Sequence, residues 1–199
     1  MFIPMVSAAH TSRDPEQKRE AILDAALALF ADRGFHGTAI PEIAERAKVS
    51  AGTIYRYFAS KEALVNALYQ REKMALARAL MPKDITLAPR RMLHEFFVGA
   101  CGYAKEHPRS LAFVEHHHHK DYLDQESRDL EQRMFAPALM FLAQAQEQEA
   151  VKKCDPEILI ALVWGMFNGL VRGEGEKRFN LDRAALAAAE ECIWQAIRA

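Results

Sequence analysis

The chain has 199 residues, of which 50% are hydrophobic and 27% charged, and its net charge is −1. These values are typical of a globular protein with one large domain or two small ones, and the near-neutral charge argues against nonspecific coating of nucleic acid. Three widely separated cysteines, Cys101, Cys154 and Cys192, give no disulfide framework and fit a reducing cytoplasm.

No segment is expected to enter a membrane or to direct secretion. The first residues have no basic region followed by a long apolar core, so they do not form a convincing signal peptide. The longest apolar run, residues 158–171, has 14 residues, whereas a membrane span needs about 20. We therefore expect a cytoplasmic protein without a membrane partner, a flexible arm over residues 1–14, and a buried helix at 158–171.

A first helix is predicted over residues 16–33, because apolar side chains recur at helical spacing and Gly34 follows the pattern. Two short helices joined by a tight turn follow between residues 38 and 61. The first has its apolar face at Ile40, Ile43, Ala44 and Ala47. The second has its apolar positions at Val49, Ile54 and Phe58, with Ser50 as its N-cap.

This pair has the helix-turn-helix layout, in which the first helix crosses the DNA backbone and the second enters the major groove. Residues 46–61 carry four Lys or Arg and no Asp or Glu, as an element facing phosphates requires. Over residues 1–65, however, eight Lys/Arg balance eight Asp/Glu. DNA affinity must therefore depend on which face the charges occupy.

The segment resembles the DNA-binding part of the tetracycline-repressor (TetR) family of bacterial transcription regulators. The matching stretches, over roughly residues 17–68, are LFADRGF at 29–35, the Thr38 start, EIAERAKVS, and GTIYRYFASKEAL at 52–64. The chain departs from the family at Lys48, where the turn usually has Gly, and at Ala51, which is often larger or basic. A non-Gly residue in a left-handed conformation costs about 1–2 kcal/mol.

The DNA-contacting residues are predicted from their chemistry and from this resemblance. Thr38 and Thr53 have short hydroxyls suited to phosphate, and Arg56 can pair with a guanine edge or, alternatively, act as a solvated or phosphate-bound charge. The resemblance implies contacts of Tyr55 and Tyr57 with backbone and thymine methyls, although Tyr57 could instead pack in the core, and of Lys61 with phosphate. The full predicted set is Thr38, Ser50, Ala51, Gly52, Thr53, Tyr55, Arg56, Tyr57 and Lys61.

Helices are predicted through the rest of the chain, without strands, which gives an all-α fold of about nine helices. They run from Ser60 to about residue 80, over 89–106, from Pro108, from Asp124 with a kink at Pro137, over 155–172 and over 181–198. The expected domains are the arm (1–14), a helix-turn-helix DNA-binding domain (15–62) and a ligand-binding and dimerisation domain (63–199).

The last two of these helices are expected to pair with a second copy of the chain. Gly165, Gly169 and Gly173 recur every four residues and form a smooth stripe, which lets helix backbones approach closely. Packing within one chain is the alternative. A two-fold, four-helix interface is favoured, since a helix-turn-helix protein needs two copies to reach two half-sites.

Aromatic and methionine side chains concentrate in the C-terminal half, where they form core or line a pocket. By the resemblance, this bundle holds a small effector, and the predicted contacts are Phe113, His116, His117, Tyr122, Trp164, Phe167 and Asn168. In the run 115–119, two imidazoles and a carboxylate could instead bind a transition metal, with Glu115, His116 and His119 as candidate ligands. A polar cluster near a loop, or a neutral His lining an organic pocket, is the interpretation we favour.

The sequence therefore predicts a TetR-like DNA-binding transcription regulator, usually a repressor in this family, released from operator DNA by a small, largely apolar effector. Effector binding would shift the population between two conformations that differ in the spacing of the two helix-turn-helix domains of the dimer. The alternative is a cytoplasmic small-molecule or metal-binding helical protein that does not read DNA. No Ser/His/Asp or Cys/His arrangement supports an enzyme, and no cofactor is expected.

Overall fold

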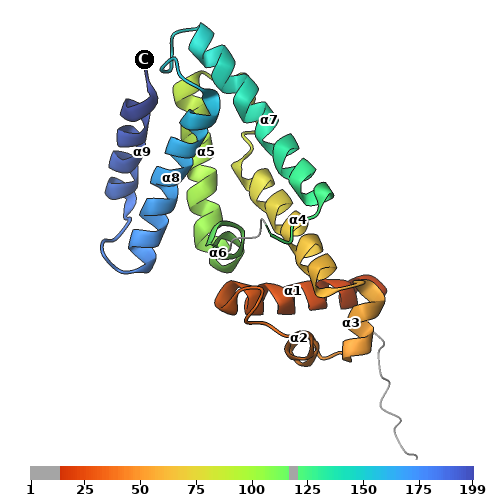
Figure 1. The fold of residues 1–199 in the computed structure, drawn as a ribbon. Coiled ribbons are helices and arrows are strands. Elements are labelled where there is room, and N and C mark those ends of the chain that lie inside the picture. The colour runs from red at the N-terminus through yellow and green to blue at the C-terminus, as the bar shows by residue number, and fades with distance from the viewer. Residues whose placement is uncertain (1–13, 117–120) are drawn as a thin grey trace, which may run out of the picture. The chain divides into compact units, whose positions relative to one another are not determined.

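The computed structural model describes residues 14–116 and 121–199. The described residues form helices joined by short connections, with one isolated β-bridge between Val151 and Arg198 and no strand (Figure 1). The predicted all-α fold is thus confirmed. The helices are α1 (Pro15–Arg33), α2 (Ile40–Ala47), α3 (Ala51–Tyr57), α4 (Lys61–Leu80), α5 (Pro89–Glu106), α6 (Pro108–His116), α7 (Gln125–Glu147), α8 (Pro156–Gly175) and α9 (Arg183–Ile197).

The chain divides into two compact units, an N-terminal unit of residues 1–68 and a C-terminal unit of residues 69–199. The division falls inside α4, as does the boundary predicted between residues 62 and 63, which stays a prediction. The predicted arm over residues 1–14 lies almost entirely outside the described residues. None of the described helices is long and apolar enough to cross a lipid bilayer.

In the N-terminal unit, α1 packs mainly against α2, and α2 against α3. The core is made by fully or almost fully buried side chains from all four of its helices: Ile22, Leu23, Phe30, Ile43, Ile54, Leu64 and Val65. At the end of α1, Gly34 has a φ of 70° and donates its backbone N–H to the Phe30 carbonyl. Glycine adopts this left-handed region without steric cost, so it ends the helix there.

In the C-terminal unit, α5 packs against α6 and α9, and α8 packs against α7 and α9. The almost fully buried aromatic side chains of this unit include Phe97, Phe113 and Phe167. Asp124, Asp155 and Asp182 accept hydrogen bonds from backbone N–H groups in the first turns of α7, α8 and α9. Since such caps satisfy amides that a helix start leaves unpaired, they fix where these helices begin.

The prediction of a buried helix at 158–171 is wrong for one face of α8. Leu159 and Phe167 are buried, but Ile158 and Leu162 on the opposite side are 53% and 50% exposed. The reason is that α8 packs against α7 and α9 with its other sides, whereas Ile158 and Leu162 face away from these neighbours. Its exposed apolar face has no cover within the described chain.

Candidate DNA-binding surface and effector cavity

The turn between α2 and α3 has the geometry of a tight helix-turn-helix turn. Lys48 takes the left-handed conformation expected of this position, with φ 58° and ψ 47°. Its N–H bonds to the Glu45 carbonyl at 3.1 Å, and the Val49 N–H bonds to the Ala44 carbonyl at 2.9 Å. These bonds end α2 within one residue and redirect the chain into α3.

The start of α3 is fixed by Ser50, as predicted. Its Oγ accepts a hydrogen bond from the Thr53 N–H at 3.1 Å and lies 2.9 Å from the Thr53 hydroxyl. A Cβ added at Gly52 would meet only the Ser50 Oγ, at 3.9 Å, among the described atoms. Gly52 is exposed, so its missing side chain leaves room for a close approach from outside rather than for packing inside the domain.

The outer side of α3 presents the aromatic and basic side chains that the sequence singled out. Ile54 is fully buried and anchors the helix, whereas Tyr55 is 53% exposed and Arg56 is exposed. The Arg56 guanidinium lies 5.3 Å from the centroid of the Tyr57 ring. Tyr57 is half-buried beside Phe58, with ring centroids 6.5 Å apart, so it contributes both to the core and to the outer side.

Two of the predicted DNA contacts are engaged inside the domain. Thr38 is only 2% exposed, and its hydroxyl donates to the Gly34 carbonyl at 3.0 Å. The Lys61 ammonium donates to the Phe35 carbonyl and lies 4.1 Å from the centroid of the Phe35 ring. Burial lowers the pKa of Lys61 below its ordinary value. Both side chains therefore hold the α1–α2 connection, and their phosphate contacts stay predictions.

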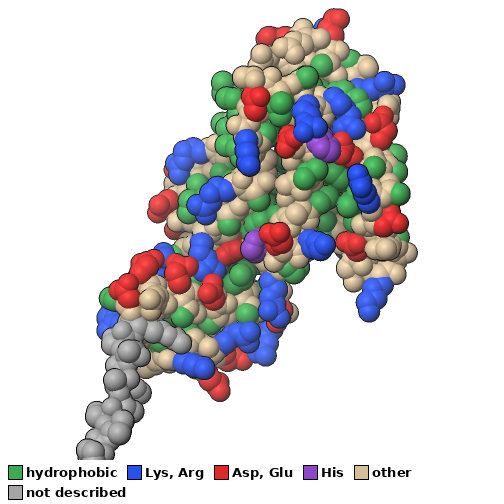
Figure 2. Space-filling view, turned by 180° about the vertical axis from the view of Figure 1, so that it is seen from behind, with side chains coloured by type: hydrophobic (Ala, Val, Ile, Leu, Met, Phe, Trp, Pro, Cys, Tyr) green, Lys and Arg blue, Asp and Glu red, His purple; other side chains and the backbone are tan. Residues whose placement is uncertain are grey.

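What matters for DNA binding by the N-terminal unit is where its basic side chains lie, not its total charge. Arg46, Lys48 and Arg56 are all exposed around the turn and α3. In the view of Figure 2, several acidic side chains gather on one side of the unit and several basic ones on the other. Such a separation creates a local positive potential in a domain whose charges nearly cancel.

Several predicted effector residues lie together in a polar cluster of the C-terminal unit. The Trp164 Nε1 and the Asn168 Nδ2 donate to the same Glu115 oxygen, at 2.6 and 3.1 Å. The Lys73 ammonium lies 3.8 Å from the other Glu115 oxygen and 3.3 Å from Glu131. These contacts tie α6 to α8 and occupy the carboxylate that was a candidate metal ligand.

Two further predicted effector residues, Phe113 and Tyr122, are described by the structure outside this polar cluster. Phe113 is fully buried and Tyr122 half-buried. His117, His119 and the side chain of His116 lie outside the described residues. Within the described part of the chain, no three His, Cys, Asp or Glu side chains are close enough to hold a metal ion.

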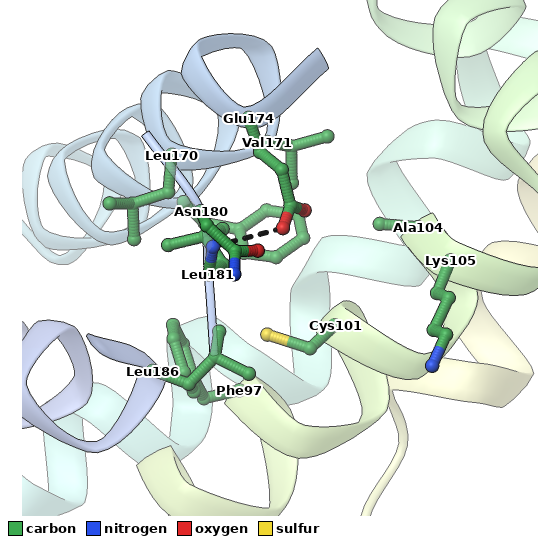
Figure 3. A pocket seen from close by; sticks show the side chains of 11 residues that line it. Phe97, Cys101, Ala104, Lys105, Leu170, Val171, Glu174, Asn180, Leu181 and Leu186 are labelled. Carbon is green, nitrogen blue, oxygen red and sulfur yellow. Dashed lines mark hydrogen bonds between the residues drawn. The ribbon is translucent and has the colours of Figure 1, made fainter. Parts of the chain in front are cut away.

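The C-terminal unit contains a cavity of about 370 Å³ between α5, α8 and the connection to α9 (Figure 3). Of the predicted effector residues, Phe167 is the one described there. The lining residues are Phe97, Cys101, Ala104, Lys105, Phe167, Leu170, Val171, Glu174, Asn180, Leu181 and Leu186. Sequence reasoning missed most of them, although Phe97, Cys101 and Lys105 recur every four residues, a spacing that marks one helix face.

Comparison with known proteins agrees with this arrangement. A family model described as "Bacterial regulatory proteins, tetR family" matches residues 22–68, and one described as "Tetracyclin repressor-like, C-terminal domain" matches residues 74–199. The HTH-type transcriptional regulator RutR of Escherichia coli K12 is 43% identical over 86 residues, which are 43% of this chain and 36% of RutR. The probable acrEF/envCD operon repressor of the same organism is 26% identical over 176 residues, 83% of this chain and 79% of that protein.

A solved structure extends the likeness over nearly the whole chain. The putative TetR-family transcriptional regulator from Vibrio parahaemolyticus has a TM-score of 0.77 and 29% sequence identity, covering 92% of this chain and 99% of its own. Members of this family bind operator DNA and act as dimers. Since the C-terminal family model alone spans well over half of the residues, the chain belongs to the TetR family of DNA-binding transcription regulators.

Proposed function

We propose that this protein is a cytoplasmic repressor, not an enzyme, whose dimer binds two operator half-sites through α3 of each copy. The observation that carries the proposal is the outer side of α3. There Tyr55 and Arg56 are exposed on a short helix whose start is fixed by Ser50 and whose inner side is anchored by Ile54. A rigid scaffold with an exposed guanidinium suits base readout in a major groove.

Pairing of two copies is supported by the outward face of α8. Gly165 and Gly169 have no described atom within 4 Å of an added Cβ, so no described residue packs directly on this stripe. Ile158 and Leu162 extend the same face with half-exposed apolar side chains. Gly173 differs, because the Phe179 ring covers it. A small, apolar face of this kind suits close packing with its own copy.

Release by a small, largely apolar effector is supported by the cavity beside α8. Its volume of about 370 Å³ falls at the lower end of the range for small-molecule sites, roughly 300–1,000 Å³. Since α8 lines the cavity on one side and carries the outward face on another, a bound ligand could alter how two copies pair.

Replacing Arg56 by Ala tests whether α3 reads bases of the operator. We expect a loss of about 1–3 kcal/mol on a cognate operator selected from random DNA, and little change on scrambled DNA, because a bidentate base contact discriminates by that amount. The exposed Arg128 of α7 provides a matched control, and Arg128→Ala should bind both DNAs like the wild type. Binding is measured by fluorescence anisotropy across a salt series. Equal losses on both DNAs in the Arg56 variant would remove this residue from base readout.

A further inference from the structure

We infer that the cavity between α5, α8 and the α8–α9 connection binds a molecule with an apolar body and one cationic amine, and that Glu174 receives the amine. The inference deepens the proposed function by naming the chemical class of the effector. It rests on that function only for the step in which the ligand releases DNA.

The inner wall of the cavity selects an apolar body. The Phe97 and Phe167 rings meet edge to face, with centroids 6.3 Å apart and planes at 84°, and both side chains are almost fully buried. Leu170, Val171 and Leu186 complete the apolar wall. Burying an apolar group against such side chains is favourable by roughly 25 cal/mol per Å² of surface removed from water.

Glu174 supplies an exposed carboxylate that is held in place and has no counter-ion in the part of the chain that the structure describes. Its Oε1 accepts a hydrogen bond from the Leu181 N–H at 3.0 Å, which ties the side chain to the α8–α9 connection. Among the described residues it forms no ion pair within 4 Å. Figure 3 shows the carboxylate turned toward the middle of the cavity, beside Asn180. A fixed, unpaired carboxylate at the edge of an apolar space favours a charged donor.

Lys105 is the other charged residue that lines the cavity. It is exposed, as Glu174 is, but in Figure 3 its ammonium points away from Glu174. Burial, together with the negative charges of Glu174 and Glu190, raises the pKa of Cys101 to about 11. The thiol is therefore neutral at pH 7 and acts as a small, weakly polar wall group rather than as a nucleophile.

The test measures binding of three molecules of the same shape by calorimetry, without DNA: 4-phenylbutylamine, 4-phenylbutan-1-ol and 4-phenylbutanoic acid. We expect the amine to bind about tenfold more tightly than the alcohol, and the acid to bind least, because a charge-assisted hydrogen bond is roughly twice as strong as a neutral one. Glu174→Gln keeps an oxygen for the Leu181 N–H. It should weaken amine binding about tenfold and leave the alcohol unchanged.

The matched control is Glu176→Gln, since Glu176 pairs with Arg178 at 3.1 Å and does not line the cavity. This variant should bind all three molecules like the wild type. Equal affinity for acid and amine, no binding of any of the three, or full amine affinity in Glu174→Gln would overturn the inference. Selective amine binding by a protein that never binds operator DNA would support the ligand class and refute the proposed repressor.

Discussion

Replacing Gly169 by Leu separates packing within the chain from packing between copies. No described atom lies within 4 Å of a Cβ built at this position, so within the described residues there is open space where a leucine side chain would begin. Within a helix, leucine is more favourable than glycine by about 0.8–1 kcal/mol. The free energy of unfolding of the single subunit should therefore stay the same or rise by about that amount.

The dimer should respond in the opposite direction. If α8 faces its own copy, the added side chain overpacks the interface at a cost of about 1–3 kcal/mol, and two-fold symmetry introduces it twice. The total of about 2–6 kcal/mol corresponds to a loss of dimer affinity of about 30-fold or more. The prediction thus combines an intact fold with a broken dimer.

Sedimentation equilibrium measures the dimer affinity, and circular dichroism during urea unfolding measures the fold. Gly102→Leu is the matched control, because Gly102 in α5 also has no described atom within 4 Å of an added Cβ and lies outside the α8 stripe. Unchanged dimer affinity in Gly169→Leu would refute the proposed interface. Dissociation of both leucine variants alike would show that the effect is not specific to α8.

Three further outcomes follow from individual contacts. Lys48→Gly should raise the free energy of unfolding of the N-terminal unit, measured in urea, by up to about 1 kcal/mol. The reason is that relief of the left-handed strain outweighs the greater flexibility of glycine in the unfolded chain. A lower free energy of unfolding would show that the strain is absent. Burial alone would raise the pKa of Glu190, but hydrogen bonds from Arg90 and His94 outweigh it and lower the pKa. The stability that ionised Glu190 contributes is therefore present at neutral pH and lost as the pH falls below about 4. Glu190→Gln should lower the free energy of unfolding by about 1–3 kcal/mol at pH 7 and by progressively less in acid. A decrease that does not depend on pH would contradict this. Cys101 should react with iodoacetamide about 100-fold more slowly at pH 8 than the two exposed cysteines, as mass spectrometry can follow, since its pKa is raised to about 11; equal rates would contradict its burial.

The helix-turn-helix segment could be predicted from sequence because its features depend on residues close together in the chain. The Ser50 cap and the left-handed turn at Lys48 depend on residues within three or four positions of each other, and both are confirmed. The same holds for the aspartate caps of α7 and α8. Spacing and capping chemistry determine such features before any tertiary contact forms.

Features that depend on tertiary contacts were not predictable in the same way. The direction of Lys61 is set by the Phe35 carbonyl, 26 positions earlier in the chain. The cavity depends on which faces of α5, α8 and α9 meet, and spacing within one helix does not specify its neighbour. Glu115 resembled a metal ligand in a His-rich run, yet its partners Trp164 and Asn168 come from α8, far along the chain.

Helix α8 contacts the proposed ligand cavity, the rest of the bundle and the proposed dimer interface. A ligand that releases DNA through α8 must therefore bind the released state more tightly than the DNA-bound state, and the required difference in affinity can be calculated. One side carries Phe167 and Glu174 to the cavity, another carries Trp164 to Glu115 of α6, and the outward side carries Gly169. A ligand shifts an equilibrium only by its difference in affinity between the two states. Moving a population from 99:1 to 1:99 needs a difference of about 10⁴-fold. In a symmetric dimer with two cavities, each site must then prefer the released state by about 100-fold, since the two preferences multiply. The amine–carboxylate contact is expected to add roughly tenfold in affinity. Even if it forms only in the released state, it is insufficient for this preference, so the apolar wall must also fit the ligand better in that state.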